Sequence, residues 1–343
     1  MESVARTSLS AVSEGQAILV LGASGFIGRW VSRLLCRNGT RPYLMVRDVE
    51  FAERIFSSYE VNGEIINLDL QRLDSVGELI SKIKPALIFN LAGYGVDRTE
   101  RDEETAYRIN ADLVEVICQA MAGVGVSTWP GRQIVHVGSA LEYGEIGGNL
   151  AEDSPVNPTT LYGQSKLKGT KVLSDWSRRA GIKGITARLF TVYGPGEHEG
   201  RLLPSLLKAA KDGEPLALTA GEQKRDFTYV EDVAEGLLRL AASDTQRGEV
   251  VNLATGRLTT VHNFIKTTAS ILDIPTDNLQ FGVIPTRSEE MQHDPVTIDR
   301  LRRLVGWAPA TEIAEGIQRT NSFVNDLRRT VIRAENGAAG AGD

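Results

Sequence analysis

Short apolar runs alternate with stretches of helical spacing through the first half of the chain. The runs with the length and composition of strands are residues 17–21, 43–46, 64–67, 86–90, 133–137 and 184–190. Between them, apolar residues recur with the period of a helix, as in residues 111–121. Most of the runs are apolar throughout, which is typical of strands covered by helices on both faces. The alternation predicts a parallel sheet.

The regular alternation ends near Tyr193, where a glycine-rich loop begins. Beyond it, the pattern predicts helices over 202–210 and 232–242 and strands over 215–218 and 250–253. We therefore expect an α/β fold, a doubly wound parallel sheet of the Rossmann type with a smaller interleaved C-terminal lobe. The predicted division is a flexible N-terminus at 1–15, a sheet domain at 16–192 with 228–256 returning to it, a lobe at 193–227 and 257–333, and a flexible tail at 334–343.

Composition narrows the class of protein. Of 343 residues, 42% are hydrophobic, which excludes disorder for the bulk of the chain. The net charge of −6 gives no pull toward nucleic acid, and no apolar run approaches the roughly 18 residues of a membrane span. Two cysteines, Cys36 and Cys118, fit a reducing cytoplasm, and His198, His262 and His293 lack the spacing of metal ligands. We expect a cytoplasmic protein without a metal, nucleic acid or membrane partner.

A glycine-rich segment follows the first predicted strand and opens a helix. In such a segment the first glycine allows a tight turn, the second lets a phosphate approach the backbone, and the third lets the helix pack on the strand. The helix then offers its N–H groups and positive dipole end to a pyrophosphate. The pattern predicts a dinucleotide site built from Gly22, Ser24, Gly25, Phe26, Ile27 and Gly28.

The end of the second predicted strand bears on the choice of dinucleotide. An NAD site usually places a carboxylate there, but this chain has Val46, followed by Arg47 and Asp48. An arginine can pair with a 2′-phosphate, which favours NADP. The alternative is NAD, with Arg47 solvated and Asp48 contacting the ribose.

Two further segments lie where a cofactor would extend along the strand ends. Asp69, followed by Leu70, comes after the third strand and is placed to accept a hydrogen bond from the adenine amino group. Its alternative role is to cap the following helix. After the fourth strand, Leu91 and Ala92 belong to a segment with small residues, which we expect to form the floor of the cofactor site.

A phenol and an ammonium are predicted on one face of a helix. Tyr162 and Lys166 are four residues apart and therefore neighbours. The ammonium, together with an oxidised nicotinamide, would favour the phenolate and make Tyr162 a general acid or base. Ser139 ends the fifth strand, at the edge where open α/β sheets bind ligands, and can bond a substrate oxygen. The alternative is an ordinary surface pair.

Five ordered motifs resemble the extended short-chain dehydrogenase/reductases, in the branch of NAD(P)-dependent nucleotide-sugar epimerases, dehydratases and reductases. The motifs are Gly-Ala-Ser-Gly-Phe-Ile-Gly at 22–28, Gly-Ser-Ala-Leu-Glu-Tyr-Gly at 138–144, Tyr-Gly-Gln-Ser-Lys at 162–166, Arg-Leu-Phe-Thr-Val-Tyr-Gly-Pro at 188–195 and Arg-Asp-Phe-Thr-Tyr-Val-Glu-Asp-Val at 225–233. The resemblance runs from about residue 17 to 320 and ends with Leu-Val-Gly-Trp-Ala-Pro at 304–309.

The resemblance implies roles for particular residues. Ser139, Tyr162 and Lys166 would act in hydride transfer at a sugar carbon, and Lys166 would also hold the nicotinamide ribose. Asn110 resembles the family's helix asparagine that supports the cofactor and active site. Thr191, Arg225 and Arg287 occupy substrate-binding positions, with surface charge as the alternative for the arginines. Family members commonly form homodimers through two helices, here about 101–121 and 160–180.

Departures from the family pattern limit the reaction. The acid pair that follows the catalytic hydroxyl residue in 4,6-dehydratases is replaced by Ala140 and Leu141. Glu142 lies one place further and would point the other way if the chain stayed extended. Thr191 stands where the family often has Asn, which puts that substrate contact in doubt, and Asn90 stands where it usually has His.

The leading interpretation is NADP-dependent reduction of a 4-keto nucleotide sugar, with Tyr162 as the proton donor. The first alternative is an NAD-dependent nucleotide-sugar epimerase, which oxidises and re-reduces one carbon. The second, from another class, is a non-catalytic dinucleotide sensor, and the intact set of Ser139, Tyr162 and Lys166 argues against it.

Overall fold

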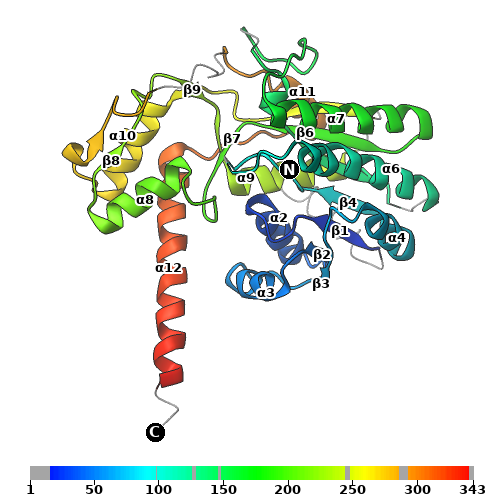
Figure 1. Ribbon diagram of the computed structural model, residues 1–343, viewed down its shortest axis with the longest axis horizontal. Coiled ribbons are helices and arrows are strands. Elements are labelled where there is room, and N and C mark those ends of the chain that lie inside the picture. Colours follow the sequence, from blue (N-terminus) through cyan, green and yellow to red (C-terminus); the bar gives the residue numbers. More distant parts are fainter. Residues whose placement is uncertain are drawn as a thin grey trace.

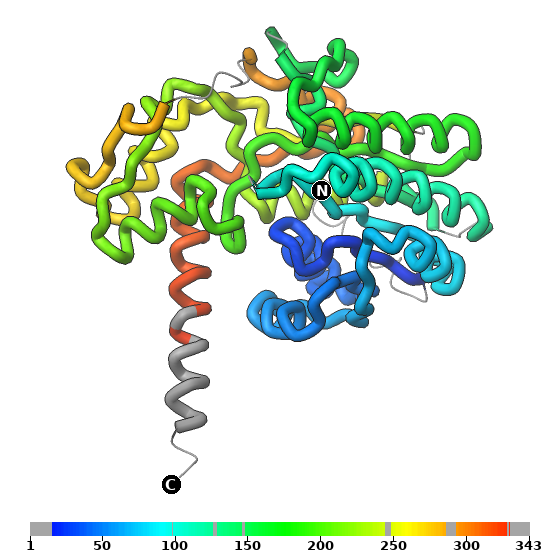
Figure 2. The backbone as a smooth tube through the Cα atoms, viewed as in Figure 1, coloured from blue at the N-terminus to red at the C-terminus, as the bar shows by residue number. Residues whose placement is uncertain are grey.

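The computed structural model describes residues 16–97, 99–125, 129–145, 148–243, 248–285 and 293–339. The predicted flexible N-terminus at 1–15 and the predicted substrate residue Arg287 lie outside these ranges, as does the end of the predicted tail at 340–343. Figures 1 and 2 show a layered sheet domain beside a smaller lobe, with the C-terminal helix running away from both.

Seven strands of the described residues form one parallel sheet, which confirms the predicted fold class. They are β1 (Ile18–Leu21), β2 (Tyr43–Val46), β3 (Glu64–Asn67), β4 (Leu87–Asn90), β5 (Ile134–Ser139), β6 (Gly184–Leu189) and β11 (Glu249–Leu253). Their order is β11-β6-β5-β4-β1-β2-β3, and each neighbouring pair is parallel. The order reverses between β1 and β4, which is where open α/β sheets bind dinucleotides.

Helices cover both faces of the sheet (Figure 1). One face carries α2 (Phe26–Arg37), α3 (Val49–Ser58) and α9 (Val230–Ala242), and the other carries α4 (Leu73–Ile83), α6 (Leu113–Gly123) and α7 (Leu161–Ala180). Alternate residues of β1 point to opposite faces of the sheet. Val20 packs in the hydrophobic core under α2, α3 and α9, and Leu19 and Leu21 pack in the core under α4, α6 and α7. A strand buried on both faces must be apolar throughout, and this is the pattern seen in the sequence.

Before α6, the chain forms a short helix α5 (Glu103–Tyr107) and a π-helical turn η1 (Arg108–Asp112). The helix predicted over 111–121 is therefore the last part of a longer helical segment, in which η1 separates α5 from α6. A π-turn inserts one extra residue per turn and shifts the faces of the helix on either side of it. This insertion has no signature in the spacing of apolar residues.

The smaller lobe is built from helices and two-stranded sheets. Its helices are α8 (Leu202–Asp212), α10 (Val261–Leu272) and the 3-10 turn η3 (Thr276–Asn278), whereas α11 (Asp299–Val305) packs against β11 and α9 of the sheet domain. Its strands pair as β7 (Thr191–Tyr193) with β10 (Phe227–Tyr229), β8 (Leu216–Ala217) with β13 (Leu279–Gln280), and β9 (Lys224–Arg225) with β12 (Thr259–Thr260). The chain leaves the sheet domain after β6 and returns to it with α9 and β11, although the predicted residue boundaries of the lobe stay a prediction.

The C-terminal helix α12 (Ile313–Ala339) continues into the segment from residue 334 that is predicted to be a flexible tail, and the flexibility of that segment stays a prediction. A helix that has already formed extends at low cost through good helix formers such as Ala and Glu, so it continues past the packed part of the chain. Closer to its start, Phe323 packs against Trp30 of α2, with ring centroids 5.3 Å apart. The helix thus joins the end of the chain to the cofactor half of the fold.

In the part of the chain that the structure describes, no helix combines the length and apolarity needed to cross a membrane. Over the same residues, no three His, Cys, Asp or Glu side chains gather in a way that could hold a metal ion.

Candidate functional site

The glycine segment after β1 forms a tight turn that leads into α2. Gly22 has φ +76°, in the left-handed region that favours glycine. A Cβ on Gly28 would lie 2.1 Å from the carbonyl oxygen of Gly22, so only glycine lets α2 approach the turn this closely. Gly25 is the N-cap of α2 and is exposed, with Ser24 beside it, so the N–H groups of Phe26 and Ile27 are available to a phosphate. The turn therefore fits the pyrophosphate of a dinucleotide.

The end of β2 carries no carboxylate. Val46 is its buried last residue, and the exposed Arg47 follows. The carboxylate of Asp48 accepts a hydrogen bond from the backbone N–H of Phe51 at 2.9 Å and caps α3. The exposed guanidinium of Arg47 is thus next to the expected ribose position, while the carboxylate of Asp48 is used to cap α3.

Asp69 and Leu70 form the turn between β3 and α4. The carboxylate of Asp69 accepts from the N–H of Gln71 at 3.0 Å, and Leu70 is buried. The N-cap position of α4 is Arg72, so Asp69 stabilises a turn and does not cap the helix directly. One carboxylate oxygen makes this bond, which leaves the predicted adenine contact compatible with the geometry.

Lys166 of α7 is anchored at the carboxyl edge of the sheet. Its side chain is 1% exposed, and Nζ donates to the carbonyl oxygens of Ala92 at 2.9 Å and Val137 at 3.2 Å. These bonds hold α7 against the ends of β4 and β5. Burial lowers the pKa of Lys166 to about 8, although Glu142 acts in the opposite direction. The amine therefore carries its proton at neutral pH.

Asn110, in the π-turn, holds the segment after β4 against α7. Its Nδ2 donates to the carbonyl oxygen of Tyr94 at 2.8 Å and to the Ser165 hydroxyl at 2.9 Å, and its Oδ1 accepts from the N–H of Tyr94 at 3.1 Å. The residue is fully buried. These bonds fix the floor that contains Leu91 and Ala92, which is a supporting role for the predicted cofactor site.

Tyr162 and Ser139 face each other across the strand edge. A hydrogen bond from Ser139 acts to lower the pKa of the phenol, as does the charge of Arg201. Burial, followed by the charges of Glu142 and Glu100, has the larger effect, so the pKa is raised above its usual value. The predicted effect of Lys166 together with an oxidised nicotinamide on the phenol stays a prediction. The ammonium lies 5.9 Å from the centre of the Tyr162 ring and is directed at carbonyl oxygens instead.

Glu142 does not point away from the site, contrary to the sequence prediction. The chain leaves its extended conformation at Ser139 and forms a 3-10 turn, Ala140–Glu142. Glu142 turns back, is 0% exposed, and accepts from the N–H of Ser139 at 2.8 Å and from Nε of Arg188 at 2.9 Å. A Cβ on Gly138 would lie 2.4 Å from this carboxylate, so glycine is required at that position. The signal in the sequence was Ser139 followed by Glu three residues later, a capping box.

Sequence reasoning also missed two charged residues that follow the Tyr-Gly-Pro motif. Arg201, directly before α8, acts on the phenol of Tyr162. Glu197 lies 3.5 Å from Nε of Arg201, and its side chain is 7% exposed. Burial raises the pKa of Glu197 to about 7. Their only signal was their place in a loop between the two parts of the fold, where ligands commonly bind.

Two of the predicted substrate residues, Thr191 and Arg225, lie on short strands outside the seven-stranded sheet. Thr191 begins β7 and is partly buried, and its N–H donates to the carbonyl oxygen of Asp226 at 3.0 Å. Arg225 lies on β9 and donates to the carbonyl oxygen of Lys224 at 2.8 Å. The carboxylate of Asp226 is buried and accepts from the N–H groups of residues 255–257, which fixes the loop after β11. The structure thus places these substrate positions on strands joined to the sheet domain through Asp226.

His136 is packed inside β5. It is 0% exposed, burial lowers its pKa, and its Nδ1 lies 3.2 Å from Nδ2 of Asn90. Asn90 also accepts from the N–H of Ala92 at 3.3 Å. Asn90, which departs from the family pattern, therefore stabilises the backbone of the segment that contains Leu91 and Ala92.

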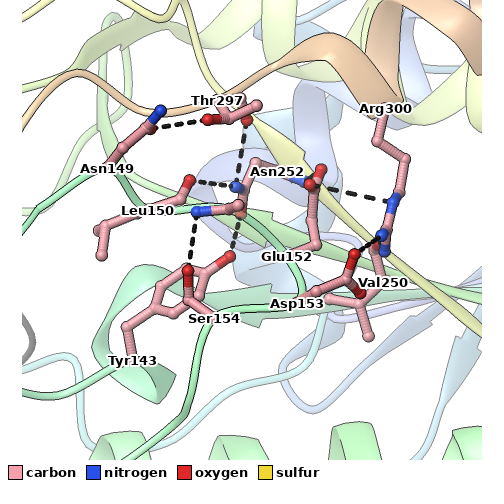
Figure 3. A network of polar contacts seen from close by, with 11 residues as sticks. Tyr143, Asn149, Leu150, Glu152, Asp153, Ser154, Val250, Asn252, Thr297 and Arg300 are labelled. Atoms are coloured by element: carbon pink, nitrogen blue, oxygen red, sulfur yellow. Dashed lines mark hydrogen bonds and ion pairs between the residues drawn. The ribbon is translucent and has the colours of Figure 1, made fainter.

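A buried polar network connects the segment after Ser139 to the edge strand β11 (Figure 3). The Tyr143 hydroxyl donates to Oδ1 of Asn252 at 2.7 Å, and Nδ2 of Asn252 donates to the carbonyl oxygens of Leu150 and Thr297. Arg300 donates to the carbonyl oxygen of Val250 at 3.0 Å. The network ties the loop before α7 and the segment before α11 to the sheet. Both segments adjoin the predicted site.

Comparison with known proteins agrees with this geometry. A model of the NAD-dependent epimerase/dehydratase family matches residues 18–254. The chain is 27% identical over 318 residues to a dTDP-6-deoxy-L-talose 4-dehydrogenase (NAD(P)(+)) of Kitasatospora kifunensis, covering 88% of this chain and 93% of the relative. It is 27% identical over 317 residues to a UDP-glucose 4-epimerase of Mycolicibacterium smegmatis, covering 89% and 97%.

Among solved structures, the chain resembles MoeE5 in complex with UDP-glucuronic acid and NAD. The TM-score is 0.76 and the sequence identity is 25%, with 90% of this chain and 99% of that chain covered. The likeness therefore extends through the smaller lobe as well as the parallel sheet.

Proposed function

Because the chain belongs to the NAD-dependent epimerase/dehydratase family, we propose that it reduces a 4-keto nucleotide sugar with NADPH. It is an NAD(P)-dependent enzyme of the extended short-chain dehydrogenase/reductase type, so the alternative of a non-catalytic sensor is set aside. The observation that carries the proposal is the group formed by Ser139, Tyr162 and Lys166 at the carboxyl edge of β5.

The residues present divide the chemistry between them. A bound nicotinamide supplies the hydride. Tyr162 donates a proton to the oxygen at the reacting carbon, and its raised pKa keeps the phenol protonated for that step. Ser139 bonds the same oxygen and orients it. Lys166, held by the carbonyl oxygens of Ala92 and Val137, presents its remaining N–H to the nicotinamide ribose.

The residues after Ser139 argue against one reaction of the family. The two positions after Ser139 are the buried Ala140 and the apolar Leu141, so no carboxylate there can drive elimination of water. This argues against a 4,6-dehydratase. An epimerase, which returns the hydride to the same carbon, uses the same three residues and is the second candidate, supported by the similarity to a UDP-glucose 4-epimerase.

The deciding experiment follows cofactor consumption. We expect stoichiometric loss of NADPH absorbance when the enzyme meets 4-keto-6-deoxy sugars linked to uridine, thymidine or guanosine diphosphate. The same preparation should not interconvert 4-hydroxy epimers with only catalytic amounts of cofactor. Interconversion of epimers without consumption of added NADPH would replace the reductase by the epimerase.

The choice of NADP over NAD rests on Arg47. We expect NADPH to bind more tightly than NADH, because the exposed guanidinium can pair with a 2′-phosphate and no carboxylate ends β2. Arg47→Ala should remove most of the difference, since a charge-assisted hydrogen bond contributes roughly 1.5–3 kcal/mol. Titration of both cofactors measures this, with Arg54→Ala, an exposed arginine of α3, as the matched control. Equal affinities in the parent protein would contradict the proposal.

We further propose a homodimer that packs α6 and α7 of one copy against those of another. The two helices contact each other and carry partly buried apolar residues, namely Val116, Ala120, Val172 and Trp176. Light scattering at micromolar concentration should give twice the 37.3 kDa mass of one chain. Trp176→Glu should shift the species toward the monomer, whereas a monomeric parent protein would rule this interface out.

The cytoplasmic location stays a prediction from Cys36 and Cys118, neither of which forms a disulfide.

A further inference from the structure

One buried carboxylate lies directly behind the catalytic group. Glu142 is 0% exposed and makes two charged contacts, one with the backbone N–H of Ser139 at 2.8 Å and one with Nε of Arg188 at 2.9 Å. Arg188 is itself buried, on the neighbouring strand β6, where it pairs with Gly138 of β5. The ion pair is therefore enclosed beneath the edge of the sheet where the reaction is proposed to occur.

Stability gives no sufficient reason for an ion pair at this place. Taking two charges out of water costs several kcal/mol per ion, and replacing a buried pair by well-packed apolar residues is often neutral or stabilising. This pair also imposes a glycine at 138, because a Cβ there would lie 2.4 Å from Oε1 of Glu142. Its position beside the reacting groups supplies a functional reason.

Glu142 acts on all three members of the catalytic group. Its carboxylate bonds the backbone of Ser139, and its charge favours the protonated states of both Tyr162 and Lys166. Among the residues that the structure describes, other charged groups that act on or lie near Tyr162 are Glu100 before α5, Arg201 before α8 and Lys166 of its own helix. Glu142 is the largest charge effect on the phenol.

Arg188, the counter-ion of Glu142, is itself held in place by the ring of Tyr143. The Arg188 guanidinium lies 4.4 Å from the centre of the Tyr143 ring, a cation–π contact. The Tyr143 hydroxyl in turn donates to Asn252 of β11, as Figure 3 shows. Because Arg188 is fixed in this way, the carboxylate of Glu142 is fixed against Ser139.

We propose that Glu142 is a positioning residue: held by its ion pair with Arg188, it orients Ser139 and places a negative charge behind the proposed proton donor, Tyr162. The proposal rests on the proposed function for its direction, since a reductase needs the phenol as an acid. It does not depend on the identity of the sugar or the nucleotide. The phenol loses its proton as pH rises, so reduction should fail above the pKa of Tyr162.

The test compares two variants, each of which removes one partner of the Glu142–Arg188 ion pair. Glu142→Gln removes the negative charge, so the pH at which reduction of a 4-keto-6-deoxy nucleotide sugar falls by half should drop by about one pH unit. The rates are measured at saturating NADPH, so that weaker cofactor binding on deprotonation of Lys166 does not limit them. Arg188→Gln leaves the carboxylate in place, so that pH should stay at or above the parent value. A purely structural role predicts the same change for both variants, and that result would overturn the proposal.

A second measurement needs no substrate. The protein is labelled with 13C at the ζ carbon of tyrosine, loaded with NADP+ or NAD+, whichever binds, and titrated by NMR. Tyr162→Phe identifies the resonance among the 8 tyrosines. At about pH 10, near the ordinary pKa of tyrosine, Glu142→Gln should show more phenolate than the parent. An unchanged titration would refute the inference, while a shifted titration without reduction of any 4-keto sugar would refute only the proposed reaction.

A third variant covers the case in which an unpaired buried charge prevents folding. The double variant Glu142→Gln/Arg188→Gln has no unpaired charge and should retain the binding of the oxidised cofactor. Because the carboxylate is gone, its phenol should still ionise at lower pH than that of the parent. A double variant with the titration of the parent would exclude an effect of Glu142 on Tyr162.

Discussion

Replacing Tyr162 by Phe is expected to reduce turnover at least about hundredfold, within the range that a positioned proton donor contributes. The dissociation constant of the cofactor should change less than about twofold, because the variant loses one hydroxyl and keeps the ring that packs near Lys166. Initial rates of NADPH oxidation and fluorescence titration of NADPH measure the two quantities separately.

Tyr107→Phe is the matched control for this variant. Tyr107 ends α5, has a partly buried ring, and has no role in the proposed chemistry, so its turnover should equal that of the parent. Retained turnover in Tyr162→Phe would remove the phenol from the mechanism. A large loss of cofactor affinity in the same variant would show that the hydroxyl serves binding as well.

Replacing Lys166 by Met is expected to lower turnover by a similar factor and also to weaken cofactor binding about tenfold or more. The buried ammonium joins the carbonyl oxygens of Ala92 and Val137, and its loss leaves two buried acceptors without their donor. Methionine fills much of the same volume, so the packing of α7 is largely kept. Lys168→Met, an exposed position on the same helix, should change neither quantity.

The pH dependence of this second variant is a separate check on Lys166. Burial lowers the pKa of the lysine to about 8, so the ammonium is present below that pH and is lost as pH rises through it. Charge-assisted hydrogen bonds are stronger than neutral ones, so the affinity of the parent for cofactor should fall above about pH 8. The Met variant should show no such fall. The same pH dependence in both proteins would assign it to another group.

The parallel sheet could be predicted almost residue by residue. Strands buried on both faces must be apolar, and the glycines of the first turn are required by a positive φ at Gly22 and by the close approach of Gly28. The apolar run over 133–137 stops two residues before the end of β5, which is Ser139, the residue that the sequence places at the strand edge. The difference is small because Gly138 and Ser139 do not follow the apolar pattern.

The surroundings of the catalytic residues could not be predicted in the same way. Glu142 was placed on the wrong side because the chain was assumed to stay extended, whereas Ser139 caps a 3-10 turn. Its partner Arg188 lies 46 residues away in the sequence, and pattern reasoning has no access to such a contact. Arg201 was missed for a related reason, since loops carry no periodicity that reports which side chains face inward.

The close fit between Gly138 and Glu142 restricts how this site can change during evolution. A side chain at 138 meets the carboxylate of Glu142 at 2.4 Å and the methyl group of Thr186 at 2.8 Å. A descendant with a larger residue at 138 must therefore move or shorten the side chain at 142, which disturbs the ion pair with Arg188. The two positions should covary among relatives, with glycine at 138 accompanying glutamate at 142, so an alignment can separate sequences that share this charged site from those that lack it.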